Sequence, residues 1–286
     1  MRPCRYTLAL SALALGLGAC GDSTDPDDDP LPDNAATAVG LTVRDNVEAS
    51  FDAFFPSRLL QPLSTGGASD PCVIASAPAD TDGDGVPDDA SYTFTAPPCR
   101  YTGVRGFTLD VVGQLRIEDP APETAGFTAD ITFTNLRFSL AAEDSDQNYS
   151  VTRNGQVFLS GTPAGLELTG GVQLLRSFTG LSDAAVEHVW TIGFDPEATL
   201  QINQPLPNGS VTVAGTVNWS RGDEAFDLTV TTISPLHYTA SCDETGQRFD
   251  DGELAVSGTF GETPGSVRIT WRECGDDPDI EFVSEE

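Results

Sequence analysis

Val211-Thr-Val-Ala-Gly-Thr-Val-Asn-Trp219 is the stretch that decides the fold class of this chain. Valine or tryptophan occupies residues 211, 213, 217 and 219, whereas the even-numbered residues between them are threonine, alanine or asparagine. A period of two places alternate side chains on opposite faces of a β-strand. The stretch therefore predicts a strand with one apolar face and one face toward water.

The same alternation recurs along most of the chain. It is found in residues 107–118, 166–174, 186–194, 226–230, 254–260 and 267–271. Clusters of Gly, Pro, Asn and Asp, which favour turns, separate these segments. Regular strands with little helix between them predict an all-β fold. We expect a strongly curved antiparallel sheet that forms a half-barrel, a barrel or a sandwich, with one N-terminal helix.

Two details of the strand pattern predict local geometry. The apolar residues are odd-numbered over residues 127–133 and even-numbered over residues 136–140, which predicts a bulge near Thr134-Asn135. Gly113, Gly215 and Gly258 fall on apolar faces. A glycine there often marks a sharp bend or the close approach of another element, so these positions indicate strong curvature.

The predicted helix precedes the strands. Its apolar stripe consists of Val43, Val47, Phe51, Phe54 and Phe55. Thr42 or Asp45 is the predicted N-cap, and Pro56 is the predicted end. A helix followed by a long sheet of amphipathic strands is similar in layout, though in no motif, to the half-barrel lipoprotein carriers of bacterial envelopes. That likeness implies that an apolar ligand binds the concave face.

The first twenty residues have the form of an export signal. Arg2 and Arg5 precede an apolar run over residues 8–18, which is too short to cross a bilayer. Leu17-Gly18-Ala19-Cys20 resembles the bacterial lipobox. This resemblance implies that residues 1–19 are a signal peptide and that acylated Cys20 anchors the protein to a bacterial membrane, on its periplasmic or cell-surface side. The alternative is an ordinary signal with an incidental cysteine.

An acidic, proline-rich segment follows the predicted anchor. Residues 20–37 contain a run of aspartates interrupted by prolines, and such a segment predicts an extended tether. Residues 38–286 are then expected to form a single β-rich domain.

The charge of the chain excludes several classes of function. The net charge is -30, and all 14 basic residues are arginine. The absence of lysine excludes a Walker-type phosphate loop and a Schiff-base enzyme. Strong negative charge also argues against nucleic acid as a partner, because phosphates would be repelled.

Four cysteines lie downstream of the signal: Cys72, Cys99, Cys242 and Cys274. An even number in an exported chain predicts disulfides. Of the three connectivities we favour the local pairs, Cys72 with Cys99 and Cys242 with Cys274. A zinc site is disfavoured because the chain has no CxxC motif and only two histidines.

An aspartate-rich loop lies between the first two of these cysteines. Its sequence, Asp80-Thr-Asp-Gly-Asp-Gly-Val-Pro-Asp88, is similar to the calcium loops of thrombospondin type 3 repeats and to the first nine positions of an EF-hand. The resemblance implies one Ca²⁺ with a structural role. It also implies the ligand set, namely the carboxylates of Asp80, Asp82 and Asp84, the carbonyl of Val86, and Asp88 directly or through water. Position twelve is Ser91 instead of a bidentate acid, so we expect weak affinity.

The sequence shows no catalytic motif such as GxSxG or HExxH. His188 and His237 lie in strand-like segments, and a histidine in an apolar register is usually a core residue. Trp190, Trp219 and Trp271 lie on apolar faces, where they form either core or the lining of an apolar pocket. We therefore expect a lipid-anchored, non-catalytic protein that binds an apolar ligand or lipid. The alternatives are a structural or adhesive surface module without a ligand and, third, a hydrolase on a β scaffold.

Overall fold

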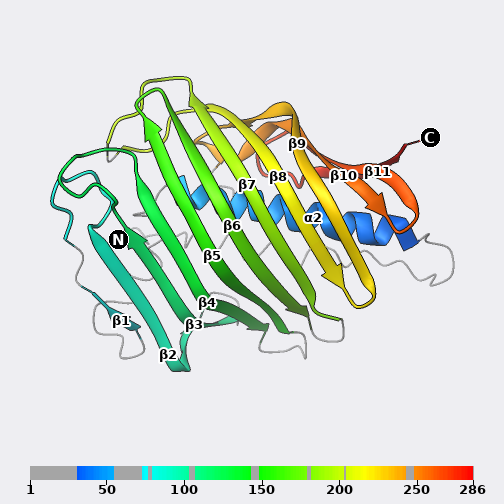
Figure 1. The fold of residues 1–286 in the computed structure, drawn as a ribbon, viewed down its shortest axis with the longest axis horizontal. Coiled ribbons are helices and arrows are strands. Elements are labelled where there is room, and N and C mark those ends of the chain that lie inside the picture. The colour runs from blue at the N-terminus through cyan, green and yellow to red at the C-terminus, as the bar shows by residue number, and fades with distance from the viewer. Residues whose placement is uncertain are drawn as a thin grey trace, which may run out of the picture.

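Residues 31–54, 73–76, 79–102, 107–142, 148–178, 182–202, 204–242 and 248–285 are described by the structure, which is a computed structural model. Within them, twelve antiparallel strands form one sheet, and each strand pairs with the strands next to it in sequence. The first and last strands do not pair with each other, so the described sheet is open (Figure 1). The strands are β1 (Val73–Ala75), β2 (Asp89–Thr102), β3 (Phe107–Glu118), β4 (Ala129–Ala142), β5 (Asn148–Thr162), β6 (Gly165–Phe178), β7 (Ala184–Pro196), β8 (Gly209–Arg221), β9 (Glu224–Tyr238), β10 (Phe249–Phe260), β11 (Thr263–Trp271) and β12 (Asp279–Ser284).

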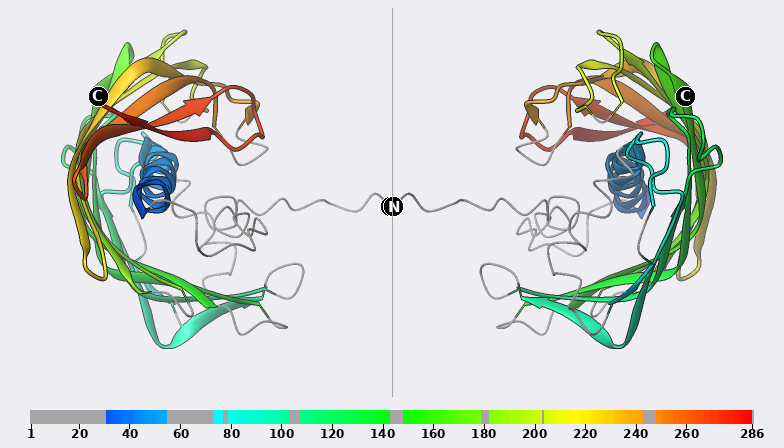
Figure 2. Two further views of the ribbon diagram at one scale, coloured as in Figure 1. Left: turned by 90° about the vertical axis from the view of Figure 1, so that its right-hand side faces the viewer. Right: turned by 90° about the vertical axis from the view of Figure 1, so that its left-hand side faces the viewer.

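The sheet curls around a single long helix. Figure 2 shows the strands as an open curve in cross-section, with helix α2 (Leu31–Phe51) lying inside that curve. A short 3-10 helix, η2 (Asp52–Phe54), continues α2. The expected fold class, a strongly curved antiparallel sheet with one N-terminal helix, is confirmed, and the half-barrel is the form that it takes.

The apolar faces of the strands make the core. In β8, Val211, Val213, Val217 and Trp219 are buried, whereas the even-numbered side chains between them are exposed. The same alternation of buried and exposed side chains runs along β7. Burial of apolar area contributes about 25 cal/mol per Å². It therefore stabilises the arrangement in which the apolar face of each strand turns toward the helix.

The predicted bulge is confirmed. The pairing of β4 with β5 shifts between Phe133 and Leu136, and Asn135 has a φ of 47°. Its backbone N–H donates to Oδ1 of Asn154 at 2.7 Å. Gly113 faces this bulge with a φ of 111°, and a Cβ on it would lie 2.1 Å from the carbonyl oxygen of Asn135. Glycine is required here because both the backbone conformation and the space exclude a side chain.

Helix α2 packs most closely against the C-terminal strands, β10 to β12. Val39, Val43, Val47 and Phe51 are fully buried along one side of it. Gly40 permits the approach, because a Cβ at this position would lie 2.6 Å from Cγ2 of Ile280 on β12. At the end of the helix, the ring of Phe51 packs on aromatic rings from three strands, those of Phe194, Tyr238 and Phe249.

The predicted start of the helix was wrong. The helix begins at Leu31, so Thr42 and Asp45 lie in its middle instead of at its N-cap. The hydroxyl of Thr42 donates to the carbonyl of Ala38 one turn earlier. The first part of the apolar stripe is made of small side chains, with Ala35 and Ala36 both buried. Because these alanines follow a stretch rich in aspartate and proline, the sequence gives no clear amphipathic pattern there. Residues 31–37 of the predicted tether are therefore helical, whereas Phe55 and Pro56 lie outside the described residues.

Candidate functional site

The aspartate-rich loop joins β1 to β2 and folds around its own carboxylates. Carboxylate oxygens of Asp80, Asp82 and Asp84 lie within 4.8 Å of one another. The backbone N–H of Asp88 donates to the carbonyl of Ala79 at 2.7 Å and closes the loop. The loop can turn this tightly because Gly83 and Gly85 adopt φ values of 77° and 91°, which favour glycine.

Asp80 organises the backbone of the loop. Its Oδ1 accepts hydrogen bonds from the N–H groups of Gly83, at 2.8 Å, and Asp84, at 3.2 Å. Its Oδ2 accepts a third from the N–H of Gly85 at 3.0 Å. These contacts hold the loop so that the three carboxylates face a common point, which is an arrangement that suits a hard cation such as Ca²⁺.

Asp84 connects the loop to a second segment of the chain. Its Oδ1 accepts from the N–H of Val86 at 2.8 Å, and its Oδ2 accepts from the N–H of Gly126 at 3.0 Å. Gly126 belongs to the connection between β3 and β4. Burial raises the pKa of Asp84 against the effect of these hydrogen bonds, and the charges of Asp82 and Asp119 raise it further. Negative charge is therefore concentrated where the two segments meet.

Asp119 is the residue of this site that sequence reasoning missed. It is 3 % exposed, and its backbone N–H donates to the carbonyls of Pro87, at 3.1 Å, and Asp88, at 3.3 Å. Its Oδ1 accepts from the N–H of Ala121 and the hydroxyl of Thr128. Its Oδ2 is buried and has no hydrogen-bond partner within the described residues, and the same is true of Oδ2 of Asp82. Asp119 stands before a proline, which indicated only a turn.

The remaining predicted calcium ligands are placed as follows. Both carboxylate oxygens of Asp88 accept hydrogen bonds from Thr81, one from its N–H at 2.9 Å and one from its hydroxyl at 2.6 Å. These bonds lower the pKa of Asp88. The side chain of Val86 is buried. Ser91 lies on β2, where its N–H donates to the hydroxyl of Ser76, so position twelve of the motif falls in the sheet and outside the loop.

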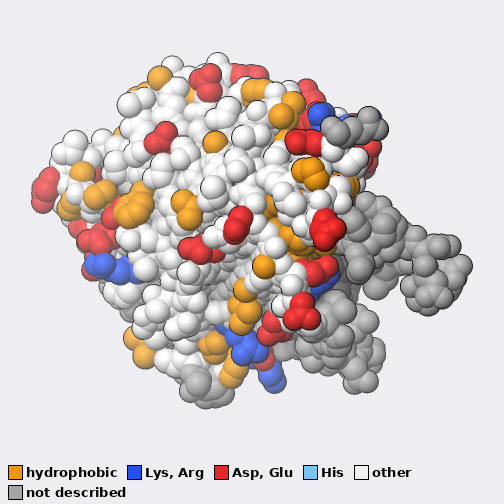
Figure 3. Space-filling model, turned by 45° about the vertical axis from the view of Figure 1, so that its right-hand side comes forward, with side chains coloured by type: hydrophobic (Ala, Val, Ile, Leu, Met, Phe, Trp, Pro, Cys, Tyr) orange, Lys and Arg blue, Asp and Glu red, His pale blue; other side chains and the backbone are white. Residues whose placement is uncertain are grey.

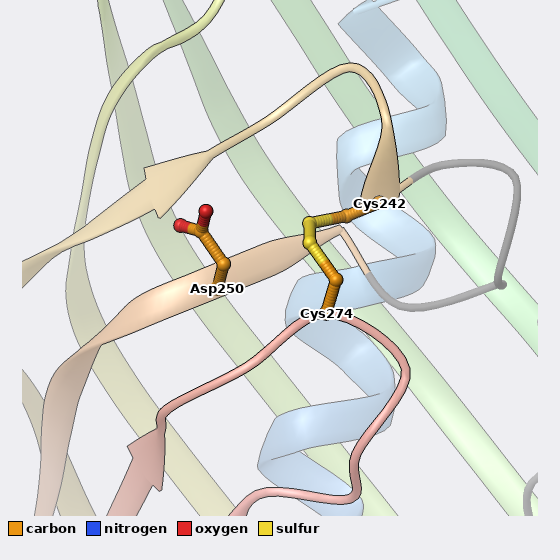
Figure 4. Close-up of side chains that lie close together, drawn as sticks. All are labelled: Cys242, Asp250 and Cys274. Atoms are coloured by element: carbon orange, nitrogen blue, oxygen red, sulfur yellow. A yellow bond between two sulfur atoms is a disulfide. The ribbon is translucent and has the colours of Figure 1, made fainter.

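The structure pairs Cys242 with Cys274 in a disulfide, as predicted, with their Cα atoms 5.0 Å apart. Figure 4 shows this bond beside the carboxylate of Asp250. Asp250 accepts hydrogen bonds from Thr239 and contacts Nδ1 of His237 at 2.6 Å, so its oxygens are engaged. Cys99 is also disulfide-bonded, and its predicted partner, Cys72, lies outside the described residues.

The three tryptophans of the predicted apolar pocket are all buried. Trp219 stacks on Phe226 with ring centroids 5.4 Å apart, and Trp271 contacts Phe249 edge-on at 5.7 Å. Trp190 lines a cavity of about 20 Å³, which is room for one water molecule. The cavity lies between the end of the helix and strands β4 to β7, and its other lining residues are Asn46, Ala49, Ser50, Ala53, Phe133, Arg153, Val157, Val172 and Leu174.

Two N–H groups at this cavity lack acceptors. Nδ2 of Asn46, on α2, and Nε1 of Trp190, on β7, are buried without a hydrogen-bond partner in the part of the chain that the structure describes. Buried polar atoms of folded proteins nearly always have partners, so an oxygen from beyond the described residues is expected here. A water or one oxygen of a ligand would satisfy them.

The two histidines lie in different environments. His188 is buried against Trp190 with ring centroids 4.3 Å apart, and burial lowers its pKa to about 3. His237 lies between Asp250 and Glu197, which raise its pKa and favour the charged ring. Both ring nitrogens of His237 are therefore engaged by carboxylates, whereas the ring of His188 is buried and neutral.

Polar side chains of α2 are also buried. Arg44 is 5 % exposed and pairs with Asp45 at 2.8 Å, and Asp45 pairs with Arg176 of β6 at 3.1 Å. Glu48 is 8 % exposed, and its Oε2 lies 4.0 Å from Nε of Arg248. Burial raises the pKa of Glu48 to about 7 although Arg248, Trp271 and Arg44 oppose it. The Asp45–Arg176 ion pair thus connects the helix to β6.

The outer surface is acidic. On the face shown in Figure 3, Asp and Glu side chains are spread among uncharged polar ones, and Arg side chains are few. No described helix is long and apolar enough to cross a membrane. Cys20, the predicted site of lipidation, lies outside the described residues.

No known protein family matches the chain, and neither a curated protein nor a solved structure was found to be similar to it.

Proposed function

We propose that this chain is a non-catalytic protein of the bacterial envelope, held to a membrane by an acylated Cys20, whose half-barrel binds a lipid or similar apolar molecule on its concave face. The lipobox-like sequence supports the anchor. The open sheet and its apolar concave face support the ligand, because such surfaces bind hydrocarbon chains. In this proposal α2 occupies the binding face when no ligand is present.

The observation that carries this proposal is the cavity beneath α2. Asn46 and Trp190 bring two N–H groups to it without an acceptor, and each unpaired buried group costs about 1–3 kcal/mol. An ester or carboxylate oxygen of a lipid would accept from both. The cavity itself has room for one water, so the hydrocarbon part of a ligand would enter only when α2 moves away from the sheet.

A structural or adhesive module without a ligand is the second candidate. The size of the cavity favours it, because about 20 Å³ is far below the roughly 300–1,000 Å³ of ligand pockets. In this case a water molecule satisfies Asn46 and Trp190, and α2 is a permanent part of the core.

A cross-link that locks the helix separates the two candidates. A Cβ at position 40 would lie 2.6 Å from Cγ2 of Ile280, so the variant Gly40→Cys/Ile280→Cys places two cysteines within reach of a disulfide. Binding of a fluorescent fatty acid is measured for the wild type, for this variant and, as matched control, for Gly40→Ser/Ile280→Ser, which carries side chains of the same size without a cross-link. Carrier function predicts binding by the wild type and the control but not by the cross-linked variant. No binding by any of them supports the structural module, and equal binding by all places the ligand elsewhere.

The anchor has its own test. Metabolic labelling with palmitate is expected to tag the wild type and not Cys20→Ala. Equal labelling of both proteins would remove the anchor from the proposal.

We also propose that one Ca²⁺ binds the loop over residues 80–88 with a structural role. The three clustered carboxylates and the unpaired, buried Oδ2 of Asp82 support it, since buried carboxylate oxygens require a counter-charge or a donor. The melting temperature of the wild type is expected to be higher in calcium than in a chelator, and Asp82→Ala, which removes the ligand oxygens, is expected to abolish this difference.

A further inference from the structure

We propose that Asp119 is an additional ligand of the calcium ion, in the place of the acidic residue that the loop motif lacks at its twelfth position. This inference rests on the proposed calcium site and adds a ligand from outside the loop. The ion would then join the loop to the connection between β3 and β4, instead of ordering the loop alone.

The register of the sheet brings Asp119 to the loop. Asp89 at the start of β2 pairs with Glu118 at the end of β3, so the residues that flank this pair, Asp88 and Asp119, are neighbours. The N–H of Asp119 bonds to the carbonyls of Pro87 and Asp88, which fixes its backbone against the loop. The pairing of β2 with β3 therefore brings Asp119 to the loop, although the two are far apart in the sequence.

Only one of the two carboxylate oxygens of Asp119 accepts hydrogen bonds within the described residues. Two donors from its own connection, the N–H of Ala121 at 2.8 Å and the hydroxyl of Thr128 at 3.2 Å, contact Oδ1. Oδ2 is buried and has no partner in the described part of the chain. A buried, ionised oxygen without a donor is unfavourable unless a cation lies beside it. The nearby carboxylate of Asp84 makes the position still less favourable without one.

The contacts of Asp88 support the same assignment. In the loop motif the ninth position serves the ion directly or through water. Here both oxygens of half-buried Asp88 accept hydrogen bonds from Thr81, so the carboxylate is already engaged within the loop. Asp80, Asp82 and Asp84 then supply the loop's carboxylates, and Asp119 supplies the fourth.

This arrangement gives calcium a mechanical role. Asp84 already accepts a hydrogen bond from Gly126 on the far side of the β3–β4 connection. An ion held by both Asp84 and Asp119 would cross-link the entry of β2 to the exit of β3, at the end of the sheet where β1 is only three residues long. The stabilising effect of calcium would therefore extend to the β2–β3 hairpin.

The test measures calcium affinity and stability for the wild type, Asp119→Asn, Asp119→Ala, Asp82→Ala and the control Glu123→Gln, all in the full chain. Glu123 is exposed in the same connection and carries the same charge. Asp119→Asn is expected to raise the dissociation constant for Ca²⁺ by about tenfold or more, since ligand charge sets the affinity of such sites. In a chelator it is expected to raise the melting temperature, because it removes an unpaired buried charge. Glu123→Gln is expected to change neither quantity.

Terbium distinguishes a ligand from a residue that only supports the structure, because the number of water molecules on the ion changes only if Asp119 binds the ion. The luminescence lifetime of bound Tb³⁺ in H₂O and D₂O counts the water molecules on the ion. Asp119→Ala is expected to increase that count by about one, because alanine offers no oxygen and water replaces the lost carboxylate. If Asp119→Asn does not melt cooperatively, Asp119→Glu serves instead, since it keeps the charge but displaces the carboxylate and is also expected to weaken binding.

The outcomes distinguish the two levels of the proposal. Wild-type affinity in Asp119→Asn and an unchanged water count in Asp119→Ala, with binding lost in Asp82→Ala, would overturn the role of Asp119 and leave the loop site standing. Absence of any calcium effect on the wild type would overturn both.

Discussion

Replacing Glu48 by glutamine is expected to make the protein more stable at alkaline pH and to leave it unchanged at acid pH. Glu48 is 8 % exposed on the helix inside the half-barrel. The groups that face it are Arg248 at the start of β10, the indole of Trp271 on β11, and Arg44 on its own helix. Their favourable effects on the carboxylate do not offset its desolvation, so the pKa of Glu48 rises from 4.5 to about 7.

The magnitude follows from that shift. Between pH 4.5 and about 7 the folded protein keeps the proton of Glu48, whereas the unfolded chain releases it. The free energy of unfolding therefore falls as the pH rises through this window and levels off above it. A shift of this size corresponds to about 3 kcal/mol at pH 8. Glutamine has the shape of the protonated acid and no charge, so it removes this loss.

The assay is urea unfolding of the wild type and Glu48→Gln from pH 4 to pH 8. The difference between their free energies of unfolding isolates Glu48, because the many other carboxylates titrate equally in both proteins. Glu167→Gln, at an exposed position on β6, is the matched control and is expected to show no such trend. A difference for Glu48→Gln that stays constant across this range would refute the reasoning, as would one that decreases with pH.

Two further predictions concern the sheet. His188 has its pKa lowered from 6.5 to about 3 by burial, so it contributes stability that is lost as the pH falls below about 6.5. His188→Leu is expected to gain about 3 kcal/mol relative to the wild type between pH 7 and pH 4, and parallel pH profiles would contradict this. Gly113→Ala is expected to lower the free energy of unfolding by more than about 2 kcal/mol, because its Cβ meets the carbonyl of Asn135 at a positive φ. Gly126→Ala is the control, since its Cβ would be 3.7 Å from the nearest atom, and equal effects of the two would refute the packing argument.

The strands and their faces were predictable because the signal is local. The alternation over residues 211–219 requires only that neighbouring side chains point to opposite sides. The slip of that alternation near Asn135 predicted the bulge in the same way. The position of Gly113 on an apolar face predicted a sharp bend or the close approach of another element, but not which element. The helix was only partly predictable, because Ala35 and Ala36 are too small to give an amphipathic signal beside a run of aspartates.

Local order along the chain determined the strand faces, the bulge and the clustering of Asp80, Asp82 and Asp84, because each depends on residues a few positions apart. Only the tertiary structure decided that the sheet stays open around α2, that Asn46 and Trp190 line one cavity, and that Asp119 lies against the acidic loop. Those contacts join residues that are more than thirty positions apart for Asp119 and more than a hundred for Trp190. They follow from strand register and curvature, which arise from the packing of the whole sheet and leave no mark in any short stretch of sequence.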